Sequence, residues 1–208
     1  MNKDRVYHLV LFSLLLAIEF IFCFTPLGSI PIGPIVATLA MIPVVITAEI
    51  LGLRYGLLMG FITGLFSFIV WTFMPPAPVA FLFTPFVNVA GQPSNYGSLL
   101  VVFVPRILTG ATTYLVFKYF KDNDLTKEIF GASVAGFVGS MTNTVLVLGL
   151  IWLVFGNAYA DIFGAKTMWA VLIATFTSNG LMEAVITAIS APILYGVFKK
   201  LNTLKTRS

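Results

Sequence analysis

Charged side chains are scarce in this chain of 208 residues. Lysine and arginine together number 12 and aspartate and glutamate 8, so charged residues make up 10% of the sequence, against 59% hydrophobic residues. A soluble domain carries about a quarter charged residues. Because the mean hydropathy is +1.00, the charges are too few to cover a water-exposed surface, and the sequence predicts an integral membrane protein.

Cysteine and histidine occur once each, as Cys23 and His8. A single cysteine excludes an intramolecular disulfide framework. A single histidine excludes the H-E-x-x-H and Ser-His-Asp arrangements, and residues 164–167 (G-A-K-T) lack the complete G-x-x-x-x-G-K-[ST] phosphate-binding pattern. We therefore predict no catalytic residue, no metal site and no ATP hydrolysis by this chain, which is not expected to be an enzyme.

Six apolar segments approach or exceed the length of about 20 residues that a membrane-spanning helix requires. They are residues 6–25, 35–52, 55–73, 98–119, 129–155 and 168–198. The second segment is short and contains Pro43, so we expect it to be kinked or broken. The pattern predicts an all-α membrane protein with six transmembrane helices in one bundle, forming a single domain over residues 1–208.

Basic residues are distributed unevenly between the two sides of this predicted bundle. With the N-terminus inside, the outer segments hold only Lys166. The inner segments hold ten basic residues, namely Lys3, Arg5, Arg54, Lys118, Lys121, Lys127, Lys199, Lys200, Lys205 and Arg207. By the positive-inside rule, both termini are predicted to be cytoplasmic. Because the basic residues sit at segment ends, the net charge of +4 does not indicate nucleic-acid binding.

The outer connection over residues 74–97 is long and unusual in composition. It contains five prolines between Pro75 and Pro93 and no charged residue. It also carries four aromatic residues, Phe81, Phe83, Phe86 and Tyr96. Long connections without their own secondary structure are usually functional or disordered. We expect this one to fold over the outer face as a lid; the alternative is a loop that lies on the membrane interface.

Small residues recur at four-residue spacing in several of the segments. Such spacing lets helix backbones approach closely. The sets are Gly56, Gly60 and Gly64; Ala135, Gly139 and Asn143; and Ser13 and Ala17. Most are expected to pack the bundle internally, whereas the last pair could equally face a partner protein.

Arg106 is the outstanding polar residue, because it lies about eight residues into the segment 98–119, within V-P-R-I-L-T-G. An ionisable side chain at such depth costs a few kcal/mol and is rarely left without a partner. No opposite charge lies near it in sequence. Two interpretations remain open: an internal pair with Glu19 or Glu183, or an anionic ligand that enters from outside and is held by the planar guanidinium.

Further polar residues lie at a similar predicted depth. Asn143 in S-M-T-N-T and Asn179 in T-S-N-G would address a ligand or form hydrogen bonds between helices. Glu183 follows Asn179 by one turn and so lies deeper on the same face, where it would bind ligand or orient Asn179 or Arg106. Glu49 lies near the inner end of its segment and is expected to reach the interface.

Four stretches carry a resemblance to a known family. They are G-P-I-V-A-T-L-A-M-I-P from Gly33, F-L-F-T-P-F from Phe81, V-P-R-I-L from Val104 and G-S-M-T-N-T-V-L-V-L-G from Gly139. With the six-segment topology, the chain resembles the S-components, or substrate-binding membrane subunits, of energy-coupling factor (ECF) transporters, and is most similar to the pantothenate-specific family. The resemblance implies high-affinity binding and ATP-driven uptake of the vitamin pantothenate by a multi-pass protein of the prokaryotic plasma membrane.

The resemblance also implies a set of site residues. Arg106 would take the carboxylate of pantothenate, and the amide and hydroxyl groups would meet nearby polar side chains. The complete candidate site is Arg106, Asn143, Thr142, Asn88, Trp71, Phe83, Tyr96, Asn179 and Glu183. Within it, Trp71, Phe83 and Tyr96 are expected to cover the dimethyl group.

The implied partners are a transmembrane T-component and two cytoplasmic ATPases, which would carry the ATP and magnesium. This chain is expected to bind no cofactor of its own, to contact membrane lipid and to bind no nucleic acid. Ser13 and Ala17 stand where the family has an A-x-x-x-A contact pattern for the T-component. The alternatives are an S-component for another small acidic vitamin or precursor, a proton-coupled carrier working alone, or an accessory protein whose charges pair internally.

Overall fold

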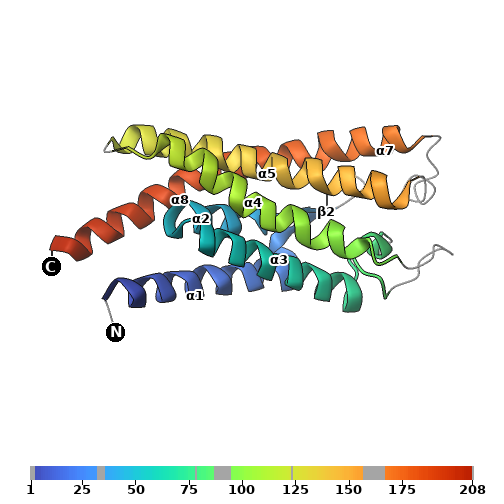
Figure 1. The fold of residues 1–208 in the computed structure, drawn as a ribbon, viewed down its shortest axis with the longest axis horizontal. Helices are drawn as coiled ribbons and strands as arrows, with labels where there is room; N and C mark the ends of the chain where they lie inside the picture. Colours follow the sequence, from blue (N-terminus) through green and yellow to red (C-terminus); the bar gives the residue numbers. More distant parts are fainter. Residues whose placement is uncertain are drawn as a thin grey trace.

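Long helices that pack into one elongated bundle make up most of the structure (Figure 1). The computed structural model describes residues 3–31, 36–77, 79–86, 95–122, 124–156 and 167–207. Its elements are α1 (Lys3–Phe24), η1 (Pro26–Gly28), β1 (Ser29–Pro31), β2 (Val36–Thr38), α2 (Met41–Leu51), α3 (Leu53–Phe73), η2 (Ala80–Leu82), α4 (Ser98–Phe120), α5 (Leu125–Phe155), α7 (Met168–Thr175), η3 (Phe176–Gly180) and α8 (Leu181–Arg207).

Within the described residues, five helical stretches are long and apolar enough to cross a membrane. They are Arg5–Phe24, Leu53–Phe73, Ser98–Phe120, Leu125–Phe155 and Met168–Leu201. These stretches match five of the six predicted segments to within a few residues. The prediction of an all-helical, multi-pass membrane protein with one bundle is therefore confirmed at this level.

The second predicted segment differs from the expectation. Its N-terminal part forms β2, which pairs antiparallel with β1, and only Met41–Leu51 is helical. At 1.5 Å per residue this 11-residue helix is about 16 Å long, roughly half of a bilayer core. Pro43 lies in its first turn, where the missing N–H breaks no helical hydrogen bond, so no kink results. Gly52, at φ 90°, then provides the turn into α3.

The last predicted helix is interrupted by a π-helical turn. α7 and α8 are joined by η3, five residues (F-T-S-N-G) with π-helical hydrogen bonding. A π turn inserts an extra residue into the helix and frequently occurs at functional sites. It changes which side chains share a face, and it places Asn179 and Gly180 in the interior of the bundle.

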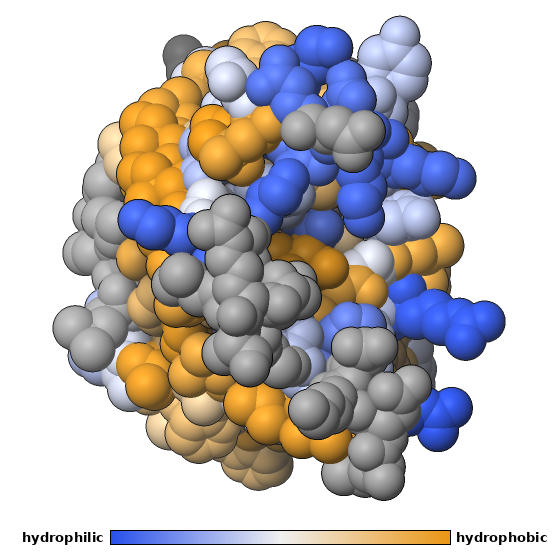
Figure 2. Space-filling model, turned by 90° about the vertical axis from the view of Figure 1, so that its left-hand side faces the viewer, coloured by the Kyte–Doolittle hydropathy of each residue, from blue (hydrophilic) through white to orange (hydrophobic). Residues whose placement is uncertain are grey.

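Both termini lie at the same end of the bundle (Figure 1). Figure 2 looks directly at this end and shows hydrophilic side chains gathered over it. Arg5 of α1, Lys127 of α5 and Lys200 of α8 belong to the segments that reach it. The assignment of this end to the cytoplasm rests on the positive-inside rule and stays a prediction.

Glycines bring α3 and α4 into close contact, as the four-residue spacing predicts. A Cβ at Gly60 would lie 2.8 Å from the carbonyl carbon of Arg106, and one at Gly110 would lie 2.5 Å from that of Gly56. Because these neighbours are backbone atoms, no rotamer change can make room. The crossing of the two helices therefore fixes the height and distance of Arg106 relative to α3.

The inner half of the bundle buries two carboxylates. Glu128 of α5 pairs with Lys199 and accepts a hydrogen bond of 3.0 Å from the Tyr195 hydroxyl. Glu49 is 4% exposed, and neither of its carboxylate oxygens has a hydrogen-bond partner among the described residues. The expectation that Glu49 reaches the interface is wrong, because the short helix α2 ends inside the bundle, against α3, α4 and α8.

The described part of the outer connection is packed into the bundle. Residues 79–85 are buried, and η2 forms a hydrophobic cluster with Trp71, Ile151 and Val171. The Thr72 hydroxyl donates a 2.8 Å hydrogen bond to the Thr84 hydroxyl and ties the connection to α3. This segment is therefore part of the core, and whether it opens and closes as a lid stays a prediction.

The close crossing of α3 and α4 leads to a stability prediction. Gly60→Ala introduces a methyl group against the Arg106 backbone, so α3 and α4 must separate, at a cost of about 1–3 kcal/mol. A lower apparent Tm of the purified protein in detergent is expected. Gly149→Ala is the matched control, because a Cβ there meets nothing within 4 Å. Equal Tm values for Gly60→Ala and wild type would contradict the close approach.

Candidate functional site

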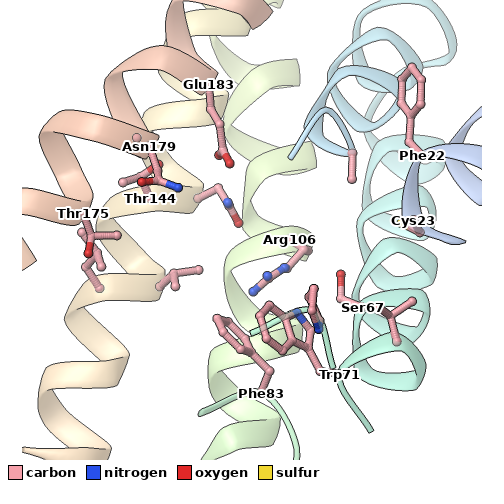
Figure 3. Close-up of a pocket in the computed structure, with 17 residues that line it drawn as sticks. Phe22, Cys23, Ser67, Trp71, Phe83, Arg106, Thr144, Thr175, Asn179 and Glu183 are labelled. Atoms are coloured by element: carbon pink, nitrogen blue, oxygen red, sulfur yellow. The ribbon is translucent and has the colours of Figure 1, made fainter. Parts of the chain in front are cut away.

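A cavity in the half of the bundle away from the termini gathers most of the predicted polar residues (Figure 3). Its volume of about 120 Å³ is several times the ~10–15 Å³ that one water needs. Its walls come from α1, α3, α4, α5, α7, η3 and α8, from the turn before α2 and from the connection between α3 and α4. The lining residues are Phe22, Cys23, Ala40, Ser67, Val70, Trp71, Pro76, Phe83, Arg106, Asn143, Thr144, Val147, Leu148, Thr175, Asn179, Gly180 and Glu183.

Arg106 is the cation in this lining, and its side chain is 7% exposed. Its Nη1 donates a 2.7 Å hydrogen bond to the carbonyl oxygen of Val101, which lies one and a half turns earlier in α4. Its guanidinium carbon lies 5.6 Å from the centre of the Phe83 ring, in a cation–π arrangement. Nε is buried and has no hydrogen-bond partner in the described part of the chain.

The internal ion pair that the sequence left open is not formed. Neither Glu19 nor Glu183 has a carboxylate oxygen within 4.0 Å of a guanidinium nitrogen of Arg106. The two salt bridges found among the described residues join Lys127 to Asp122 and Lys199 to Glu128. Glu183 is nevertheless the carboxylate that acts most strongly on the guanidinium by electrostatics. The positive charge of Arg106 therefore faces the cavity without direct neutralisation.

Two aromatic rings form the wall beside Arg106 (Figure 3). Phe83, from the outer connection, stacks on Trp71 of α3 with ring centres 4.6 Å apart and an interplanar angle of 25°. Phe83 is 3% and Trp71 9% exposed. This pair offers an apolar surface next to the cation, so the cavity suits a ligand with one charged end and one apolar part.

α5 contributes amide and hydroxyl groups to the opposite side. Asn143 is 6% exposed, and its Oδ1 is buried with no hydrogen-bond partner among the residues described. An unpaired buried carbonyl oxygen costs about 1–3 kcal/mol, so a donor from a ligand would be stabilising there. Thr144 packs against Gly180 of η3, where any Cβ would overlap its side chain.

The interrupted helix presents three polar residues to the cavity at four-residue intervals. They are Thr175 of α7, Asn179 of η3 and Glu183 of α8 (Figure 3). The Ser178 hydroxyl donates a 2.7 Å hydrogen bond to Asn179 Oδ1 and orients the amide. One helix face therefore combines a hydroxyl, an amide and a carboxylate.

A thiol and a second carboxylate lie at the α1 side. Cys23 lines the cavity, and its thiol donates a 3.3 Å hydrogen bond to Glu19 Oε1. Glu19 is fully buried but does not line the cavity. Glu19, one of the two carboxylates considered as a partner for Arg106, therefore reaches the cavity only through its hydrogen bond with Cys23.

The predicted site residues fall into four groups. Arg106, Asn143, Asn179, Glu183, Trp71 and Phe83 lie together around the cavity. Thr142 and Tyr96 do not line it: the Thr142 hydroxyl donates to the Val138 carbonyl of its own helix at 2.8 Å, and Tyr96 is 76% exposed. Asn88 lies outside the described residues. Ser13 and Ala17 lie on the exposed face of α1, away from the cavity.

Sequence reasoning missed several lining residues. Thr175 was detectable, because it precedes Asn179 and Glu183 at the same four-residue spacing. Cys23 follows Glu19 by four residues and was detectable in the same way. Nothing in the sequence favours Thr144 over Thr142, since only the rotation of α5 about its axis decides between two neighbours of Asn143.

An apolar helical bundle with a buried cavity that contains a cation is typical of a membrane protein that binds a small molecule. The family comparison agrees with this class: the model described as "ECF transporter, substrate-specific component" matches residues 8–195. The chain therefore belongs to the substrate-specific components of ECF transporters, which are transporter subunits that bind substrate and are not enzymes.

One similar relative has a named substrate. The chain is 38% identical over 159 residues to the pantothenic acid transporter PanT of Lactococcus lactis subsp. cremoris (strain MG1363). The match covers 75% of this chain and 74% of the relative. The resemblance predicted from the four sequence stretches is thus confirmed at the level of the family, with a pantothenate transporter among its relatives.

The unpaired side-chain oxygen of Asn143 predicts opposite effects of one substitution on stability and on ligand binding. Asn143→Leu removes a buried, unsatisfied oxygen and keeps the branching of the side chain beside an open cavity, so the empty protein is expected to keep or raise its apparent Tm. The rise in Tm on adding substrate is expected to be lost. Thr142→Val is the control, because that hydroxyl bonds its own helix and lies outside the cavity. A clear loss of stability in the empty Asn143→Leu protein would contradict the unpaired state.

Proposed function

We propose that this chain binds pantothenate in the cavity around Arg106 and serves as the substrate-specific subunit of an ECF transporter that imports it. The observation that carries the proposal is the buried guanidinium, which faces the cavity without an ion pair to Glu19 or Glu183. The likeness to PanT supports pantothenate as the anion.

The carboxylate of pantothenate is the natural partner of Arg106. A guanidinium binds a carboxylate through two parallel hydrogen bonds, which are short and strong because both groups are charged. Nε and Nη2 form the edge of the guanidinium that suits this pairing, and Nη1 is already bonded to Val101. The ligand then supplies the negative charge that no described carboxylate provides within ion-pair distance of Arg106.

The rest of pantothenate matches the remaining groups of the cavity. Its amide and two hydroxyls carry donors for the unpaired Asn143 Oδ1 and meet polar groups at Asn179 and Glu183. Its two methyl groups suit the apolar surface of Trp71 and Phe83. The amphipathic character of the cavity thus follows the amphipathic character of the molecule.

Transport would need partner subunits, because this chain carries no complete ATP-binding pattern. A transmembrane T-component and two ATPases, with ATP and magnesium, would supply the energy in the prokaryotic plasma membrane. On this proposal the chain contributes six membrane segments to the complex, of which the second is helical only over Met41–Leu51, and both termini are cytoplasmic. Ser13 and Ala17 lie on the exposed face of α1, where small side chains permit close packing of a partner helix.

The binding proposal predicts a large effect of Arg106→Ala. Removing one partner of a buried charged pair costs about 2–5 kcal/mol, so the Kd for pantothenate is expected to rise at least about 30-fold. Arg54→Ala is the control, since Arg54 is exposed and outside the cavity. Isothermal titration calorimetry on the purified chain in detergent measures the Kd of both variants and of wild type. Tight binding that survives Arg106→Ala would remove Arg106 from the site, and absence of binding by wild type would reject pantothenate.

The transport proposal predicts dependence on ATP and on partners. Proteoliposomes with this chain alone and a proton gradient are expected to take up no labelled pantothenate, whereas those with the T-component, both ATPases and internal ATP accumulate it. Ala17→Leu is expected to abolish uptake and leave binding unchanged, because a larger side chain blocks helix packing on α1. Gradient-driven uptake by the chain alone would establish a secondary carrier instead.

A further inference from the structure

We propose that Pro105 is a positioning residue of the substrate site. By removing one backbone N–H from α4, it leaves the Val101 carbonyl free to hold the Arg106 guanidinium in the cavity. This inference rests on the proposed function, in which Arg106 binds the carboxylate of the substrate.

The hydrogen-bond ladder of α4 is interrupted at Pro105. In an α-helix each N–H donates to the carbonyl four residues earlier, so an N–H at position 105 would donate to the Val101 carbonyl. Pro105 lies inside α4 and has no N–H, so the Val101 carbonyl loses its helical donor. Arg106 Nη1 replaces that donor at 2.7 Å. The proline and the arginine next to it therefore act as a unit.

The hydrogen bond to Val101 also fixes the direction of the Arg106 side chain. Helical side chains point towards the helix N-terminus, and bonding to Val101 fixes the Arg106 side chain in this direction, beside the Phe83 ring. Nη1 lies cis to Cδ, whereas Nη2 lies on the same side as the Nε–H bond, so anchoring Nη1 leaves the Nε–Nη2 edge for a carboxylate. No described residue accepts a hydrogen bond from that edge. The anchor thus selects which edge of the cation meets the substrate.

A second proline in the chain provides an internal comparison. Pro192 lies inside α8 and frees the carbonyl of Ala188 in the same way. There the donor is the Ser133 hydroxyl of α5, at 2.7 Å, and none of these three residues lines the cavity. The same helix defect therefore joins two helices at one place and orients the charged group of the site at the other.

Pro105→Ala tests the inference, because alanine restores the N–H and favours the helix. The new N–H competes for Val101, so the Kd for pantothenate is expected to rise about tenfold, the effect of one hydrogen bond to a charged group. In the Arg106→Ala background the same change is expected to have no further effect. Binding of the alcohol analogue, in which a hydroxymethyl group replaces the carboxylate, is expected to change little. Pro192→Ala is the control and should bind as wild type does.

A measurement without ligand keeps this inference separate from the proposed function. In protein labelled with ¹⁵N-arginine, the anchored Arg106 is expected to give separate Nη1 and Nη2 resonances, because rotation about the Nε–Cζ bond is hindered. In Pro105→Ala these resonances should merge, while those of the other three arginines stay unchanged. Unchanged Arg106 resonances in Pro105→Ala, or an equal loss of affinity with and without Arg106, would overturn the positioning role. Failure of wild type to bind pantothenate would reject the substrate and leave the resonance test to decide.

Discussion

The site depends on the way one guanidinium is accommodated away from water. A charged group in an apolar interior is costly unless it is paired or hydrogen-bonded. Arg106 has a carbonyl of its own helix, an aromatic face and the more distant field of Glu183, but no direct ion pair among the described residues. These contacts stabilise the cation without neutralising it, so an anion that enters the cavity gains a strong partner.

Irregular backbone positions two of the polar groups near this cation. Within an apolar medium, a freed carbonyl or an interrupted helix is tolerated only where protein or a cavity surrounds it. Pro105 frees a carbonyl beside the cavity, and the π turn of η3 directs Asn179 into it. The close crossing of α3 and α4 at Gly60 then holds the backbone of Arg106 against α3, the helix that also carries Trp71.

Much of the site was within reach of sequence reasoning, because polar residues in apolar segments are few. Arg106, Asn143 and Asn179 were predicted to share one level, with Glu183 one turn deeper, and all four line one cavity. Depth along a helix follows from counting residues, since the rise per residue is constant. The rotation of each helix about its axis does not follow from counting, and for that reason Thr142 was predicted although the described cavity excludes it.

Sequence alone was enough to establish the class of the protein, five of the six predicted membrane segments and the presence of a costly cation in the outer half of its segment. Composition and the length of apolar runs decide these features, whatever the neighbours are. Three features became clear from the packing of the helices: α2 is about half the length of a bilayer core, Glu49 is buried, and Arg106 bonds to Val101 instead of a glutamate. These outcomes depend on which surfaces meet, because a buried polar group takes the partner that packing brings within hydrogen-bond distance.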